Sequence, residues 1–297
     1  MYNVNDDLNV FFNTGLVEKA PIMDNVIYFD GTVASDPANE KFLHNEFGVN
    51  YRFGKLGINA SAYNTDWQDR NLTKSVTTGQ GDSGDTDVIF LTGVNQKHSG
   101  VELETNYMVN DMLDLMFVAS FGNWKFDGDA NGNYQETEYN SEGQAIGYTT
   151  TEYAYALDGL YVGDMPQTSY VLGVTLKPIK DLRIQAIHKM YDKNYSDWSP
   201  SAREFDGTND DADRAQVWEA PSYNRLDLHM SYKLPKVKDL DMMLTANIFN
   251  VLDEVYVQDA VDNSQYNGYG SKQHLPHNAE VFLGTPRYAN IGLSIGF

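Results

Sequence analysis

The feature that most constrains this chain is the strict alternation of its last eleven residues, 287–297. Successive side chains of a β-strand point to opposite faces, so alternate residues share a face. One face of this strand would be wholly apolar, with Ala289, Ile291, Leu293, Ile295 and Phe297. The other would be mostly small and polar, with Tyr288, Asn290, Gly292, Ser294 and Gly296. Such a strand suits a sheet that has one apolar and one polar environment.

The same alternation predicts nine earlier strands. They cover residues 8–14, 46–53, 56–63, 100–107, 113–122, 170–176, 182–190, 225–233 and 240–248. The connections after the second, fourth, sixth and eighth strands are short, and the other five are long. An up-and-down arrangement with every long connection at one end produces this order. Ten strands are enough to close a small barrel, but residues 1–4 look like the tail of a preceding strand, which favours a fragment of a longer protein.

Charge is segregated between the two faces. From the second strand to the tenth, the apolar faces carry no Asp, Glu, Lys or Arg between their flanks, apart from Arg287 at the start of the last strand. A charge facing lipid near mid-bilayer costs about 2–4 kcal/mol, so the pattern predicts an all-β, antiparallel, up-and-down transmembrane barrel. A soluble β-sandwich would tolerate the same segregation but does not need five long connections. The net charge of -21 argues against nucleic acid as a partner.

Four segments of the chain resemble a known family. Residues 244–256 resemble the penultimate-strand signature of TonB-dependent outer-membrane receptors, and residues 98–104 resemble that family's Gly-Val-Glu-Leu-Glu strand. Residues 45–53 and 62–67 resemble its barrel hairpins, most like those of the large, SusC-like receptors of Bacteroidota. The terminal Phe297 resembles the aromatic residue that the barrel-assembly machinery reads.

The resemblance implies a 22-stranded barrel that houses an N-terminal plug. Residues 1–297, with about ten strands, would be the C-terminal portion of that barrel, without the plug and the earlier strands. The implied activity is energised uptake of a scarce ligand, such as a siderophore, cobalamin, a glycan or a peptide, and not catalysis. The implied location is the outer membrane of a Gram-negative bacterium, with the long loops outside the cell and the C-terminus in the periplasm.

The resemblance also implies partners. These are outer-membrane lipid, the missing plug and N-terminal barrel of the same protein, TonB through that missing part, the barrel-assembly machinery through Phe297, and a surface lipoprotein as a lid. Two other classes of protein stay open. One is a small self-closed barrel enzyme of the omptin kind, and the other is a soluble β-rich binding or adhesion domain.

Residues 127–138 match the spacing of a calcium-binding loop, D-x-[DN]-x-[DN]-G-x5-E. The oxygen ligands would come from Asp127, Asp129, Asn131, Asn133 and Glu138, and a glycine would permit the sharp turn. The alternative is a turn at the tip of a hairpin, which has the same Asp, Asn and Gly composition. No flanking helices are predicted. Calcium is the one cofactor that the sequence suggests.

Four aromatic residues in the long connections are candidates for stacking on a sugar or another flat ligand. They are Tyr153, Tyr155, Trp198 and Trp218. The alternative role for each of them is to pack the loops onto one another.

Two residues on the polar face of the strand 225–233, Arg225 and His229, are candidates for ligand contacts inside the barrel. They could instead pair with neighbouring charges or with a plug. The sequence contains no Gly-x-Ser-x-Gly elbow, and its six histidines do not have the spacing of zinc ligands. The sequence therefore predicts binding and transport without catalysis.

Overall fold

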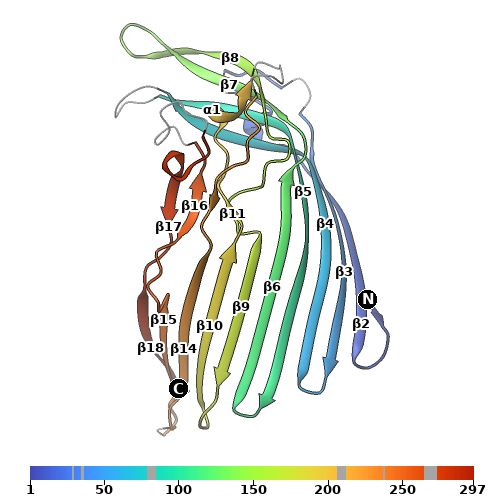
Figure 1. Ribbon diagram of the computed structural model, residues 1–297. Helices are drawn as coiled ribbons and strands as arrows, with labels where there is room; N and C mark the ends of the chain where they lie inside the picture. Colours follow the sequence, from blue (N-terminus) through green and yellow to red (C-terminus); the bar gives the residue numbers. More distant parts are fainter. Residues whose placement is uncertain (29, 35–36, 79–84, 206–211, 237, 264–272) are drawn as a thin grey trace.

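The computed structural model describes all residues except 29, 35–36, 79–84, 206–211, 237 and 264–272. Its main element is a tall, curved antiparallel sheet (Figure 1). Eleven of the strands follow one another in the order β1-β2-β3-β4-β5-β6-β9-β10-β14-β15-β18. Consecutive neighbours pair without a crossover, which confirms the predicted up-and-down arrangement.

The strands of this path are β1 (Tyr2–Asn3), β2 (Leu8–Lys19), β3 (Glu40–Phe53), β4 (Leu56–Thr78), β5 (Asp85–Asn110), β6 (Leu113–Phe126), β9 (Thr168–Leu176), β10 (Leu182–Asp192), β14 (Tyr223–Lys233), β15 (Asp241–Phe249) and β18 (Tyr288–Gly296). All ten predicted strands are present. The predicted tail before the first of them is β1, which pairs with β2 through Tyr2 and Val10.

Short and long connections lie at opposite ends of the sheet, as predicted. The short ones, residues 4–7, 54–55, 111–112, 177–181 and the described part of 234–240, lie at the lower end in Figure 1, where the C-terminus also lies. The long ones lie at the upper end. We call the described residues of the long connections above the sheet, within 68–96, 127–167, 193–222 and 250–287, the loop cap.

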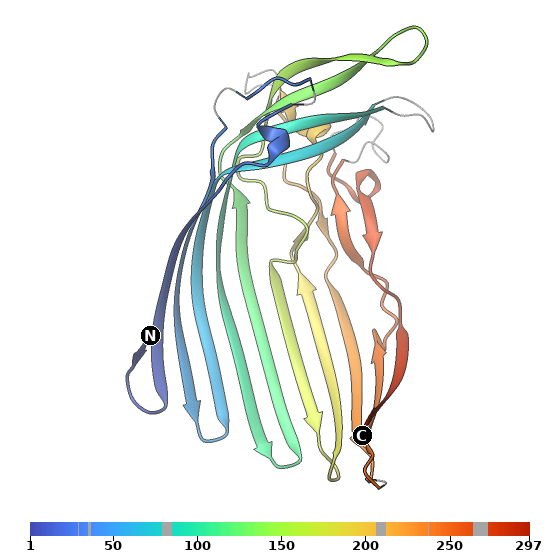
Figure 2. The same ribbon diagram turned by 180° about the vertical axis from the view of Figure 1, so that it is seen from behind.

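The loop cap contains more strand than the sequence predicted. Residues 66–96 were predicted to be a polar loop, but β4 and β5 continue through most of them as a hairpin that leans over the sheet (Figure 2). Residues 127–166 contain a second hairpin, β7 (Ala130–Tyr139) and β8 (Ala145–Tyr155). The loop prediction was wrong here because pairing above the membrane needs only backbone hydrogen bonds, so the sequence need not alternate.

The other elements of the long connections are short. They are η1 (Met23–Asn25), β11 (Asn194–Tyr195), α1 (Pro200–Arg203), β12 (Glu204–Phe205), β13 (Glu219–Ala220), β16 (Val257–Val261), η2 (Pro276–Asn278) and β17 (Glu280–Leu283). No helix in the described part of the chain has the length and apolar character required to cross a membrane.

The hydrophobic core lies in the loop cap and not against the sheet. Its buried side chains are Ile89, Leu91, Val94, Phe126, Ala130, Tyr155, Leu157, Leu160, Tyr195, Trp198 and Val217. On the convex face of the sheet, by contrast, Phe117 is 37% exposed and Leu293 is 55% exposed. No second layer of described residues covers that face (Figures 1 and 2). The apolar sides of the strands are therefore not the interior of a sandwich.

The strand register aligns apolar residues into rows on the convex face. One row runs through Ile58, Thr105, Phe117, Leu172, His188 and Leu226. His188 is an ionisable residue on this face that the sequence pattern did not single out. The charged residues predicted for the opposite face, such as Glu104 and Asp227, do lie on it, because they alternate with members of these rows.

Candidate functional site

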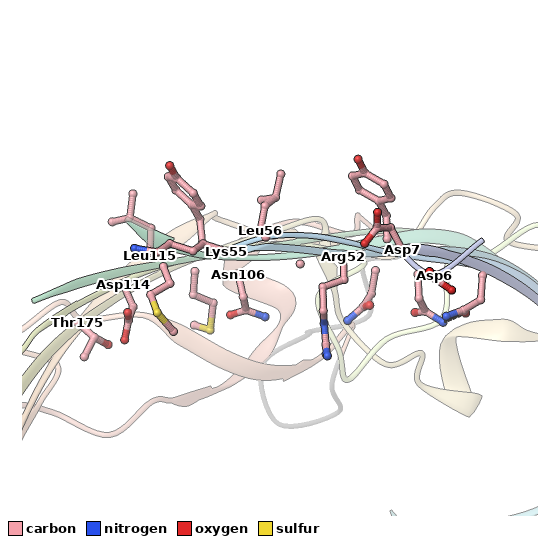
Figure 3. A pocket seen from close by; sticks show the side chains of 18 of the residues that line it. Asp6, Asp7, Arg52, Lys55, Leu56, Asn106, Asp114, Leu115 and Thr175 are labelled. Atoms are coloured by element: carbon pink, nitrogen blue, oxygen red, sulfur yellow. Dashed lines mark hydrogen bonds between the residues drawn. The ribbon is translucent and has the colours of Figure 1, made fainter. Parts of the chain in front are cut away.

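The concave face of the sheet forms a polar hollow of about 700 Å³ near the short turns. Figure 3 shows Arg52, Asn106, Asp114 and Thr175 on the inner side of the arched strands, with Leu56 on the opposite side. Asp114 pairs with Lys177 at 2.5 Å, whereas Arg52 has no ion-pair partner among the described residues. The hollow is therefore lined by charged and polar side chains and is not an apolar pocket.

The predicted site residue Arg225 lies beside a buried carboxylate, that of Asp227. Asp227 is 1% exposed and accepts a hydrogen bond from Lys189 Nζ at 2.9 Å. Its other oxygen lies 3.8 Å from the Arg225 guanidinium and accepts the backbone N–H of Asn250 at 2.9 Å. The Arg225 guanidinium also lies 5.5 Å from the centre of the Tyr256 ring. Within this chain, Lys189 thus pairs directly with the buried carboxylate, and Arg225 is a second, more distant cation beside it.

The second predicted lumen residue, His229, lies four positions after Arg225 on β14. Its Nδ1 atom lies 2.8 Å from Asn247 Oδ1, and its ring lies edge-on to Phe249 with centroids 5.3 Å apart. The sheet and not the loop cap holds these contacts, so the structure does not bring His229 together with the predicted loop aromatics. A ligand role for Arg225 and His229 stays a prediction.

The predicted loop aromatics have different surroundings. Tyr155 and Trp198 are 0% and 2% exposed, and their rings lie 6.1 Å apart within the core of the loop cap. Burial raises the pKa of the Tyr155 hydroxyl. Tyr153 is half-buried and lies edge-on to Tyr134 at 6.3 Å. The carbonyl of Trp218 accepts hydrogen bonds from Ser196. Protein covers the ring faces of Tyr155 and Trp198, which matches the packing alternative.

The calcium-loop motif lies partly in an extended strand. Asn131 and Asn133 belong to β7 and pair with β5, and Glu138 near the end of β7 accepts a hydrogen bond from Thr149. Asp127 pairs with Lys97 at 2.7 Å. Asp129 receives two hydrogen bonds from Arg214, at 2.7 and 3.0 Å, which lower the pKa of its carboxyl.

Within β7 the alternate residues advance about 6.6 Å along the strand, so in this structure the side chains of Asn131, Asn133 and Glu138 are spread along it. The part of the chain that the structure describes contains no group of three or more His, Cys, Asp or Glu able to hold a metal. Calcium binding at residues 127–138 stays a prediction from the sequence.

Sequence reasoning missed an aromatic cluster on the concave face just below the loop cap. Trp124 Nε1 donates a hydrogen bond to Tyr63 Oη at 2.9 Å, and the Trp124 ring stacks on His98 at 5.6 Å. Both rings lie over glycines. A Cβ at Gly100 would lie 2.5 Å from Tyr63 Oη, and one at Gly122 would lie 2.8 Å from Trp124 Nε1. The signal in the sequence was the two glycines on polar faces, which the register places side by side.

A buried ionic network ties two parts of the loop cap together. Arg203 is fully buried and donates to the carbonyls of Asp213 and Ala215 at 2.9 and 2.7 Å. His274 lies between two carboxylates, with Nδ1 2.5 Å from Asp262 Oδ2 and Nε2 3.0 Å from Asp213 Oδ2. The hydrogen bond with Asp262 raises the pKa of His274. These Asp–His pairs are buried beside Arg203.

The signature at residues 244–256 has a structural role in the described chain. Asn250 is fully buried at a left-handed position, with φ of 50°. Its side chain donates to the carbonyls of Glu254 and Thr285 and accepts the N–H of Glu254, at 2.9, 3.2 and 3.0 Å. Asp253 accepts the N–H of Arg287 at 2.9 Å. These side chains fix the exit from β15 and the entry into β18.

Known structures show the same fold. The chain superposes on the ferric-catecholate import receptor Fiu from E. coli K12 with a TM-score of 0.58 and 14% identity, over 99% of this chain and 34% of that one. For the copper transporter OprC the TM-score is 0.60 with 15% identity, over 100% and 38% of the two chains. For the siderophore receptor PiuA from Acinetobacter baumannii the TM-score is 0.59 with 16% identity, over 99% of this chain and 34% of that one.

The chain thus spans about a third of the length of these neighbours. A comparison with curated protein sequences found no match. The family model described as TonB dependent receptor-like, beta-barrel, matches residues 1–251. That match covers most of the chain, and it agrees with the antiparallel path, the uncovered convex face and the one-sided loop cap. The chain belongs to the TonB-dependent receptor-like β-barrel family.

Proposed function

We propose that this chain forms the later strands of an outer-membrane barrel that takes up a scarce ligand with energy transmitted through TonB. The observation that carries the proposal is the position of the hydrophobic core. The core lies in the loop cap, while the convex face of the sheet leaves large apolar side chains such as Phe117 and Leu293 uncovered. Lipid suits such a face, because exposing so many large apolar side chains to water is unfavourable.

The neighbours support uptake as the class of function. The named ones are a ferric-catecholate import receptor, a copper transporter and a siderophore receptor. Ligand classes consistent with this family are siderophores, cobalamin, glycans and peptides. The SusC-like subtype remains a prediction from the sequence motifs.

The proposal includes an orientation and partners. The loop cap would face the outside of the cell, and the short turns with Phe297 would face the periplasm. The polar hollow around Arg52 and Asp114 would lie inside the barrel, where a plug from earlier sequence would fill it. The exposed Phe297 would be read by the barrel-assembly machinery, and a surface lipoprotein would cover the loop cap.

The test uses the full-length receptor in its own cells. Uptake of labelled ferric siderophores, cyanocobalamin, oligosaccharides and short peptides is measured in the parent strain, a strain without this gene and a strain without TonB. We expect uptake of one ligand class to be lost in both deletion strains, and the protein to fractionate with outer membranes. A protein that stays soluble without detergent, or uptake of all four classes unchanged by either deletion, would refute the proposal.

A further inference from the structure

Tyr63 and Trp124 form a flat surface on the concave face, which we call the Tyr63–Trp124 plate. Each ring lies against the backbone of a glycine, because a Cβ at Gly100 would lie 2.7 Å from Tyr63 Cζ and one at Gly122 would lie 2.8 Å from Trp124 Nε1. The hydrogen bond from Trp124 Nε1 to Tyr63 Oη joins the two rings at their edges. Each ring also stacks on a neighbouring histidine, Trp124 on His98 at 5.6 Å and Tyr63 on His44 at 6.4 Å, so the rings and imidazoles form one aromatic surface. Both side chains are only half-buried.

The residues around the plate are hydroxyls, amides, carboxylates and histidines. Three rows of the register contain the plate and its neighbours: Gly48, Ser61, Glu102, Ser120 and Ser169; Asn13, Glu46, Tyr63, Gly100 and Gly122; and His44, Thr65, His98 and Trp124. None of these residues is Lys or Arg. Two of them, Glu46 and Glu102, are carboxylates that accept hydrogen bonds and repel anions.

The charge and polarity of these surroundings favour some classes of flat ligand over others. An anionic aromatic chelate would face the carboxylates of Glu46 and Glu102, in a chain of net charge -21. The cation near the plate, Arg70, is already engaged with Gln96 at 3.3 Å and with the Trp67 ring at 4.4 Å. A quaternary ammonium group prefers a cage of several rings and not one flat plate. A neutral sugar ring offers an apolar C–H face to the plate, and hydroxyl groups to the carboxylate and serine oxygens at its edge.

We propose that the Tyr63–Trp124 plate is a saccharide-binding subsite inside the barrel. The inference rests on the proposed uptake function and gives it a ligand class. A sugar ring stacks on the two rings, and its hydroxyl groups bond to Glu102 and to the row of serines below the plate. The plate lies directly beneath the loop cap, since Trp124 is two residues from the end of β6. A ligand entering through the loops would meet it first.

The test measures binding by the full-length receptor in detergent. The probes are maltoheptaose, xylohexaose, laminarihexaose and mannohexaose, and the readouts are titration calorimetry and tryptophan fluorescence. We expect one of these oligosaccharides to bind, and Trp124→Ala to weaken its binding about tenfold, a loss of about 1.4 kcal/mol, because the variant removes the ring over Gly122. Trp124→Phe should keep most of the affinity because it keeps a ring over Gly122.

Trp67→Ala is the matched control. Trp67 is also on the concave face, but the Arg70 guanidinium already covers its ring at 4.4 Å, so its loss should leave saccharide affinity unchanged. Heat-modifiable migration on gels would show that each variant is folded. The inference is overturned if no neutral oligosaccharide binds, if Trp124→Ala and Trp67→Ala weaken binding equally, or if ferric catecholates bind in a manner that depends on Trp124. If the receptor takes up a ligand other than a saccharide in a TonB-dependent manner, the saccharide subsite is refuted but the proposed uptake function is not.

Discussion

Leu103→Arg tests whether lipid covers the convex face. Leu103 lies on that face near the middle of the membrane-spanning part of β5, and its neighbours across the sheet are Ala60 and Ala119. These small side chains cannot shield an introduced charge. The nearest charged residue of β5 on the convex face is Lys97. It lies six residues from Leu103, which is about 20 Å at ~3.3 Å per residue. An arginine at position 103 therefore cannot reach the polar region above the sheet.

The expected cost lies near the upper part of the range of about 2–4 kcal/mol measured for cations near mid-bilayer. Because each 1.4 kcal/mol is a factor of ten, ~3 kcal/mol lowers the folding equilibrium constant about a hundredfold. The assay is a denaturant titration of the full-length receptor folded in lipid vesicles, followed by tryptophan fluorescence. The midpoint should fall while the slope stays the same.

Glu104→Arg is the matched control for Leu103→Arg. Glu104 is the next residue on the same strand, points to the concave face and is exposed. Its replacement loses one hydrogen bond from Asn106, at 2.7 Å, which is worth about 1 kcal/mol or less at an exposed site. Equal destabilisation by the two arginines would refute the assignment of the convex face to lipid.

Three further predictions concern the loops. Trp198→Ala removes a 2% exposed ring from the core of the loop cap and should destabilise the cap by about 3–5 kcal/mol, seen as faster limited proteolysis of the loops without loss of the barrel's gel mobility. Asn250→Ala removes three hydrogen bonds at a left-handed residue and should lower folded yield in lipid, whereas an unchanged yield would contradict the structural role of the signature. The pKa of His274 is raised by its bond with Asp262, so the stabilisation is complete below about pH 6.5 and is lost as pH rises through the raised pKa. Amide hydrogen exchange in the loop cap should therefore become faster with rising pH by more than the chemical exchange rate itself increases. In His274→Gln this additional acceleration should be absent.

Much of the sheet could be predicted from the sequence because its cause is local. Lipid on one side and water on the other require a side-chain period of two, and that period is visible in residues such as Leu113 to Gly122 without knowledge of any partner. The turn at 54–55 and the tail at Tyr2–Asn3 were likewise predicted from short segments. The hairpin β7–β8 and the upper parts of β4 and β5 were missed, because strands above the membrane need no such period.

The candidate site was less predictable because side chains that meet there come from distant positions. Tyr63 and Trp124 are 61 residues apart, and Lys189 and Asp227 are 38 apart. Aromatic residues in the loops attracted attention by their type, yet Tyr155 and Trp198 became core. The plate, by contrast, depends on two glycines whose importance appears only when the strands are paired.

The sequence by itself determined the order and facing of the ten predicted strands of the main sheet, the charge of each face and the end that carries the long loops. Tertiary structure alone decided which residues lie side by side: the rings over Gly100 and Gly122, the cations around Asp227, and the histidine between two loop carboxylates. The physical reason is that alternation fixes the face of a side chain, whereas strand register and loop packing fix its neighbours across the sheet and within the loops.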